Sequence, residues 1–271
     1  MKRTVHDKWK AVTALLLSIA LTACAVGPSA SESSDRLATA KAMFAQRCRA
    51  AGERIYRTAD NVEGIYLLKI RPEKINYNEQ FVLDDPYGRD LSGISYIKSF
   101  LRGSYQAETT GVAKAGSPPR LGYMYVVAAD EKGGLYKYIG RLQEHEVTSS
   151  VLVGGTGKKF KTTEFVVEKI IFSGAAPRYG VSYDDISTKE ERDYWIAGSS
   201  LKIIDLETKE IVAERIGYMI DLAQGNTVGG RSPWLFAADH ACPKFAAHNG
   251  ASAQGNQTLD FAEKVLRPKV N

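Results

Sequence analysis

Two pairs of adjacent aspartates, Asp84–Asp85 and Asp184–Asp185, are the carboxylates best placed to act together. Paired carboxylates could provide the acid and base of a glycosidase, or oxygen ligands for Ca²⁺. Both pairs stand in turn-like sequence, where aspartates routinely accept hydrogen bonds from backbone N–H groups. We therefore expect both pairs to shape turns, and we assign them neither catalysis nor calcium binding.

Histidine and cysteine are the residue types that could bind a transition metal. His145 lies between two glutamates, a pattern typical of a solvated surface loop. His240 and His248 flank Cys242. A structural zinc site needs four ligands, and no second ligand pair stands at a suitable spacing. The sequence therefore predicts no metal site.

The glycine-rich segment 152–159, LVGGTGKK, has the outline of a phosphate-binding loop. Such a loop requires glycine at its first position and Ser or Thr at its last, whereas Leu152 and Lys159 stand there. The pattern Gly-x-Ser-x-Gly of serine hydrolases also does not occur around Gly93 or Gly198. The sequence predicts no cofactor and no catalytic residue. A non-enzymatic function is expected, with an enzyme that has an unrecognised site as an alternative.

The first 23 residues have the composition of an export signal. Basic residues dominate positions 2–10, and the ten residues 11–20, AVTALLLSIA, are uncharged and almost all apolar. This apolar run is shorter than the roughly 20 residues that span a bilayer. It has the length expected of a signal-peptide core. We expect residues 1–23 to be a cleaved signal peptide.

The sequence Leu-Thr-Ala-Cys at residues 21–24 resembles the lipobox of bacterial lipoproteins. The resemblance implies cleavage before Cys24 and acylation of this cysteine, by palmitate or similar chains. Two or three acyl chains anchor a protein durably, whereas one binds only marginally. An Asp after the lipobox cysteine favours retention in the inner membrane, and this chain has Ala25 there. The resemblance thus implies anchoring in the cell envelope, at the outer membrane facing the periplasm.

The chain without its signal has 248 of the 271 residues, enough for one large domain. The formal charge of +5 includes a net +3 from the signal, so the remainder carries about +2. Basic and acidic residues alternate along it, which argues against a nucleic-acid partner. We divide the chain into a signal at 1–23, a lipidated flexible tether at 24–35, and a single α+β domain at 36–271.

Acylation of Cys24 leaves Cys48 and Cys242 as the two remaining cysteines. An exported protein folds in an oxidising compartment, where disulfides persist. An even pair favours a disulfide between Cys48 and Cys242, with two separate buried thiols as the alternative.

Hydrophobic periodicity predicts an α+β fold with a mainly antiparallel sheet of six to nine strands. We expect one helix near each end of the chain and a short helix at 94–101. The disulfide would join the N-terminal helix to the C-terminal segment. The terminal helices are predicted at 36–50 and 259–266. Strands are predicted within 55–71 and at 121–129, 135–142, 165–172, 179–183, 200–206 and 210–220.

Tyrosine and tryptophan are abundant, with 14 and 3 residues respectively. Such residues mostly pack against sheets with a polar tip, and they also anchor protein interfaces. Tyrosines at 123, 125, 136 and 138 share the parity of one predicted hairpin, which favours packing. Tyr87, Tyr194 and Trp195 stand near polar loops, and we predict that these three contact a protein partner.

The segments 48–72, 84–88 and 242–243 together resemble a group of poorly characterised proteobacterial lipoproteins. Some of these accompany type VI secretion lipase effectors as candidate immunity proteins. The resemblance spans most of residues 44–245 and implies a lipoprotein that binds a secreted lipase effector and blocks it. It carries no functional residue over to this chain. A structural or assembly lipoprotein of an envelope complex is the alternative.

Overall fold

The computed structural model describes residues 30–71, 81, 85–88, 92–104, 120–130, 132–148, 155–245 and 253–270. Several predicted features lie outside these residues: the signal, Cys24, Asp84, His248 and the start of the glycine-rich segment. The chain divides into two compact units, residues 1–39 and 40–271, with the boundary inside the first described helix. None of the helices in the described part is long and apolar enough to cross a membrane.

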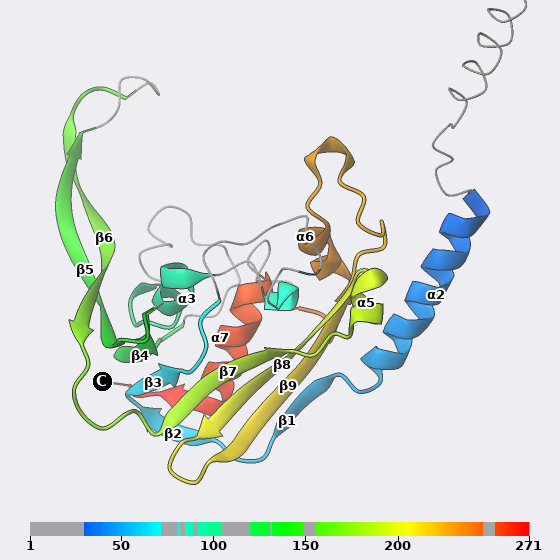
Figure 1. The fold of residues 1–271 in the computed structure, drawn as a ribbon. Helices are drawn as coiled ribbons and strands as arrows, with labels where there is room; N and C mark the ends of the chain where they lie inside the picture. The colour runs from blue at the N-terminus through cyan, green and yellow to red at the C-terminus, as the bar shows by residue number, and fades with distance from the viewer. Residues whose placement is uncertain are drawn as a thin grey trace, which may run out of the picture. The chain divides into compact units, whose positions relative to one another are not determined.

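The second unit is a mixed α+β structure built on one large sheet (Figure 1). Helices and strands alternate irregularly along the chain. The helices are α2 (Ala30–Cys48), α3 (Gly93–Ser99), α5 (Lys189–Asp193), α6 (Pro233–Ala237) and α7 (Ala253–Val265), with 3₁₀ turns η1 (Pro86–Gly88), η3 (Val228–Gly230) and η4 (Ala238–His240). The strands are β1 (Gly52–Ile55), β2 (Ala59–Val62), β3 (Gly64–Leu67), β4 (Tyr125–Ala129), β5 (Leu135–Thr148), β6 (Lys159–Ile171), β7 (Tyr179–Asp185), β8 (Ile196–Asp205), β9 (Glu210–Ile220), β10 (Ala241–Cys242) and β11 (Leu266–Pro268).

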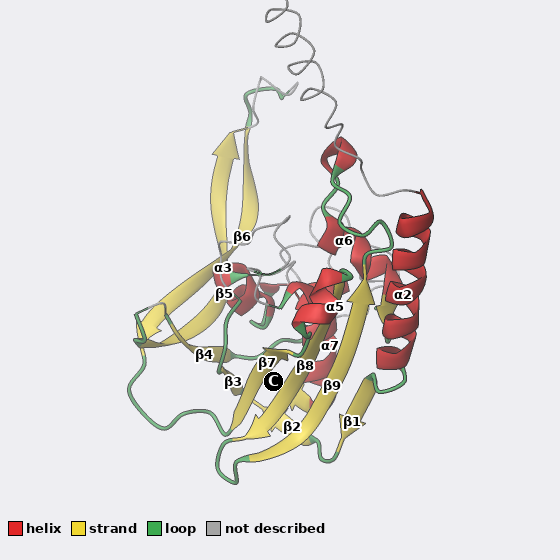
Figure 2. Cartoon of the chain, turned by 45° about the vertical axis from the view of Figure 1, so that its right-hand side comes forward, coloured by secondary structure: helices red, strands yellow, loops and turns green. Residues whose placement is uncertain are grey.

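The large sheet has nine strands in the order β1-β9-β8-β7-β3-β4-β5-β6, with β10 also paired to β9. Most neighbours are antiparallel, as predicted, but β3 runs parallel to both β4 and β7. β3 therefore joins two antiparallel groups, β4-β5-β6 on one side and β7-β8-β9-β1 on the other (Figure 2). Strands β2 and β11 form a separate parallel pair.

The main hydrophobic core lies where α3 and α7 pack against the sheet. Helix α3 contributes Tyr96 and Ile97, and α7 contributes Phe261 and Val265, all of them buried. Burying each such side chain contributes about 1.5–3 kcal/mol. This core fixes the central strands, and with them the position of the β4-β5-β6 group.

Strands β8 and β9 are covered on both faces at their outer ends. On β9, Met219 belongs to a cluster with Trp234 of α6, whereas its neighbours Tyr218 and Ile220 belong to a cluster with Ala40 of α2. Adjacent residues of a strand point to opposite faces, so consecutive burial requires cover on both sides. The sequence 210–220 lacks clean alternation for this reason, and its predicted bounds are those of β9.

The predicted disulfide between Cys48 and Cys242 is present, with 5.6 Å between the Cα atoms. It joins the last residue of α2 to β10. Helix α2 begins at Ala30, so residues 30–35 are helical, although we predicted a flexible tether through residue 35. The expectation of a helix at each end was too simple: α3, α5 and α6 lie between α2 and α7, and the chain continues beyond α7 into β11.

Candidate binding site

Strands β5 and β6 form a long hairpin that extends beyond the packed part of the sheet (Figures 1 and 2). The two strands pair without a bulge from Tyr136–Ile171 at the base to Thr148–Lys159. The base ends at the pair Leu142–Phe165, where the Phe165 ring is buried against Gly140, a position with no room for a side chain. We call the outer part, residues 143–148 and 159–164, the arm.

No residue of the arm is buried, so cross-strand pairs alone hold it together. Ion pairs join Lys159 to Glu146 at 2.8 Å and Lys161 to Glu144 at 3.9 Å. Exposed ion pairs contribute only about 0–1 kcal/mol each. Near its outer end Phe160 pairs with Val147, and the phenyl side chain is 51% exposed. The arm thus presents an aromatic side chain on a ribbon whose residues are all exposed or half-buried.

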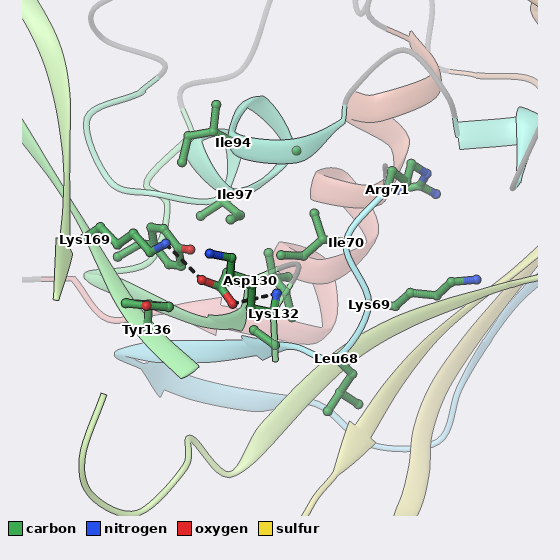
Figure 3. A pocket seen from close by; sticks show the side chains of 14 residues that line it. Leu68, Lys69, Ile70, Arg71, Ile94, Ile97, Asp130, Lys132, Tyr136 and Lys169 are labelled. Carbon is green, nitrogen blue, oxygen red and sulfur yellow. Dashed lines mark hydrogen bonds and ion pairs between the residues drawn. The ribbon is translucent and has the colours of Figure 1, made fainter. Parts of the chain in front are cut away.

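A cavity of about 730 Å³ lies at the base of this hairpin, between β3, α3, β4 and β5 (Figure 3). This volume is within the range of about 300–1,000 Å³ that is typical of small-molecule sites. Apolar side chains of β3 and α3 form one part of the lining, and polar side chains from the β4–β5 turn and β6 form the other. The lining residues are Leu67, Leu68, Lys69, Ile70, Arg71, Gly93, Ile94, Ile97, Ala129, Asp130, Lys132, Tyr136, Tyr138 and Lys169.

Asp130 organises the polar side of the cavity. Its Oδ1 accepts hydrogen bonds from the backbone N–H groups of Lys132 and Gly134, each at 3.0 Å, which closes the turn between β4 and β5. Its Oδ2 lies 3.5 Å from Nζ of Lys169 on β6. Desolvation raises the pKa of Asp130, but the backbone N–H groups of Gly134 and Lys132, together with Lys169, outweigh it and lower the pKa. This carboxylate is therefore ionised at neutral pH.

The cationic groups of the lining differ in what they contact. Nζ of Lys169 lies 3.7 Å from the ring centroid of Tyr136, a cation–π geometry, as well as near Asp130. Lys69 and Arg71 extend away from the cavity in Figure 3. Lys69 lies over the ring of Tyr183 at 4.4 Å. Lys132 is exposed, and no described carboxylate pairs with its amine.

Arg71 belongs instead to a buried polar cluster beside the cavity. Its Nη2 donates to Oδ2 of Asp85 at 2.7 Å, and its guanidinium lies 4.1 Å from the ring centroid of Tyr183 and 5.0 Å from that of Tyr96. Burial alone lowers the pKa of Arg71, but Asp85 and the two tyrosines outweigh this effect and raise it. Burial raises the pKa of Asp85, and Arg71 opposes that shift. The pair stabilises the ionised arginine and is not placed to attack a substrate.

Two of the three predicted partner-contacting residues lie in the interior, which corrects that prediction. Tyr87 is 1% exposed and accepts a hydrogen bond from Arg215 at 2.8 Å. Trp195 is 7% exposed and packs against Trp234, with ring centroids 5.0 Å apart. Neither can anchor a partner in this structure, because both side chains are buried. Tyr194 is half-buried at the end of α5, against the cluster that contains Ala40.

Both members of the second aspartate pair end strand β7, and only Asp185 has the expected role in a turn. Oδ1 of Asp185 accepts the backbone N–H of Ser187 at 2.9 Å, while Asp184 pairs with Lys202 at 2.7 Å. The role of Asp85 as the partner of buried Arg71 was not predicted. Arg71 is the last residue of a mostly apolar segment that ends before Pro72. Nothing in this local sequence indicates that its guanidinium is buried. Of the hairpin tyrosines, Tyr123 and Tyr138 are buried, so these two pack as expected.

Within the described residues, no group of three or more His, Cys, Asp or Glu side chains is placed to hold a metal ion. His145 belongs to the arm and His240 is exposed on η4. The described chain therefore forms an α+β domain with a nine-stranded sheet, a disulfide, the arm and the cavity. Searches against protein-family models, curated proteins and solved structures find no match to this chain.

Proposed function

We propose that this protein is an envelope lipoprotein, anchored through Cys24 at the outer membrane and facing the periplasm, that acts by binding another protein. The arm carries the binding part of this proposal. An isolated two-stranded ribbon is only marginally stable in water, so a ribbon of this length with an exposed aromatic residue is suited to gain contacts from a partner. Phe160 replaces Tyr87 and Trp195 as the expected aromatic anchor.

Edge geometry also supports binding by the arm. β6 is the outermost strand of the sheet, and its pairing with β5 contains no bulge. Natural proteins usually protect edge strands with bulges, prolines, charges or a covering element. β6 contains no proline, and it carries lysines at 159, 161 and 169 as its main protection. A partner could contact both the apolar pair of Phe160 with Val147 and the adjacent charges.

The partner class follows from the sequence resemblance alone. It implies a secreted lipase effector, and the protein would then be an immunity protein that blocks the enzyme by covering its entrance. A stable complex of this kind needs about 800 Å² of surface on each side and a few well-placed anchors. Catalysis by the domain itself forms no part of the proposal.

A pulldown from envelope extract with the lipidated protein, followed by titration with effectors encoded beside its gene, tests the proposal. We expect Phe160→Ala to weaken binding at least tenfold, the effect of losing roughly 1.4 kcal/mol at an aromatic anchor. Phe236→Ala is the matched control, because Phe236 has almost the same exposure, 49% against 51%, but lies on α6. Equal affinity of both variants and the parent would exclude the arm.

Competition between strains tests the immunity part separately. A deletion strain mixed with its effector-secreting parent should be killed, and a plasmid copy of the intact gene should rescue it. Survival of the deletion strain, with no binding to a neighbouring effector, would refute the immunity function. Turnover of lipid substrates by the purified domain alone would instead favour an enzyme.

A further inference from the structure

We propose that the cavity at the base of the hairpin is a binding site for a small monoanionic amphiphile, such as a medium-chain fatty acid. This inference is independent of protein binding by the arm. It starts from the division of the lining into apolar and charged parts, which lie on different elements (Figure 3).

The apolar part suits a hydrocarbon chain. Ile94 and Ile97 of α3 line the cavity together with Ile70, and Figure 3 shows Ile97 between the other two. Ile97 is 3% exposed and belongs to the main core, so this wall is rigid, whereas Ile94 is 47% exposed at the rim. Burial of apolar surface is worth about 25 cal/mol per Å², so a chain lying against these residues would gain affinity with its length.

The charged part suits a single negative charge. Two amines, those of Lys132 and Lys169, and one carboxylate, that of Asp130, line the cavity on this side. Asp130 is committed to the turn through two backbone N–H groups, and it neutralises only one of the two amines. The group therefore has a net charge of +1. A monoanion would make it neutral.

The remaining cations of the lining do not change this count. Arg71 is paired with Asp85, and Lys69 extends away from the cavity over Tyr183. Tyr136 supports the position of Lys169 by placing its ring under the amine. The geometry thus brings an excess amine next to an apolar wall, the combination that an ionised fatty acid requires.

Titration calorimetry of the purified domain with octanoate, 1-octanol and acetate tests the inference, since these probes separate the chain from the charge. We expect octanoate to bind at one site per chain and more tightly than either other probe. Equal affinity for 1-octanol would show that the charge is irrelevant, and equal affinity for acetate that the chain is irrelevant. Either result, or no octanoate binding, would overturn the proposal.

Matched variants locate the site. Lys169→Gln removes the net positive charge of this group, because Asp130 is then left to neutralise Lys132, and it should weaken octanoate binding roughly tenfold. Lys161→Gln on the same strand removes the same charge in the arm and should leave octanoate affinity unchanged. Ile94→Ser should also weaken binding, whereas Ile211→Ser, at a similarly exposed position on β9, should not. Equal effects within either pair would place octanoate elsewhere. Unchanged thermal unfolding would verify that each variant is folded.

Discussion

The Cα atoms of Cys48 and Cys242 lie 5.6 Å apart, although 194 positions separate the two residues in the sequence. The disulfide closes a loop that contains most of the domain. A chain-entropy estimate for such a loop is about 5 kcal/mol, and measured losses for native disulfides are typically about 2–5 kcal/mol. We expect Cys48→Ser with Cys242→Ser to lower the free energy of unfolding by that amount, measured by urea denaturation. Two free thiols in non-reducing mass spectrometry of the parent protein would contradict the premise.

The second prediction concerns the anchor. Cys24→Ser should abolish acylation, because the thiol that accepts the first lipid is removed. Metabolic labelling with a palmitate analogue, followed by membrane fractionation, measures the effect. The variant should be released from the membrane or accumulate unprocessed with its signal. Undiminished label in Cys24→Ser would rule out this site of lipidation.

The third prediction concerns the buried pair of Arg71 and Asp85. Asp85→Asn should lower the free energy of unfolding by about 3–5 kcal/mol, because it leaves a buried guanidinium without its counter-charge. Asp184→Asn is the control, since it breaks the pair with Lys202 in which the Asp184 side chain is 53% exposed. That change should cost no more than about 1 kcal/mol. Similar losses for the two variants would mean that Arg71 is not held by Asp85.

The fourth prediction concerns pH. Hydrogen bonds from Arg178, together with the backbone N–H of Glu207, lower the pKa of Asp205 below its ordinary value of 3.8. A carboxyl whose pKa is lower in the folded state stabilises the fold above its ordinary pKa, and this contribution is lost as the pH falls through the folded value. Asp205→Asn should therefore be less stable than the parent near neutral pH, with a difference that shrinks below pH 3.8. A difference independent of pH would refute this role.

Some elements followed directly from sequence because their signals are local. The strand 210–220 was predicted with the bounds of β9. The three residues between it and the strand predicted at 200–206 form the turn, in which Lys209 has the left-handed backbone conformation. The strands predicted at 121–129 and 135–142 likewise left Gly133 and Gly134 between them, in the turn that joins β4 to β5. Side-chain alternation does not specify which strand lies beside which, so the parallel placement of β3 between β4 and β7 could not be predicted.

The misplaced aromatic residues show a different limit. Trp195 follows the charged sequence KEERD, which suggested an exposed turn. Two of those charges are themselves buried: Glu191 pairs with Arg47, and Arg192 pairs with Asp185 and lies over the ring of Trp234. Charged neighbours indicate a surface only when they are solvated, and pairing partners distant in sequence are invisible in a local pattern. The cavity was missed for the same reason, because its lining comes from four separate segments.

The disulfide also determines how the domain would carry a mechanical load applied at residues before Cys48. Without it, tension would pass from the end of α2 directly into β1, an edge strand whose pairing with β9 begins at Gly52 and Ile216. Such a strand could be peeled away one hydrogen bond at a time. With the disulfide, part of the tension passes to Cys242, and β10 transmits it to β9 at Tyr218. A pull on the N-terminal segment would then load two edge strands of β9 at once, β1 and β10, so that β1 would no longer carry the whole force.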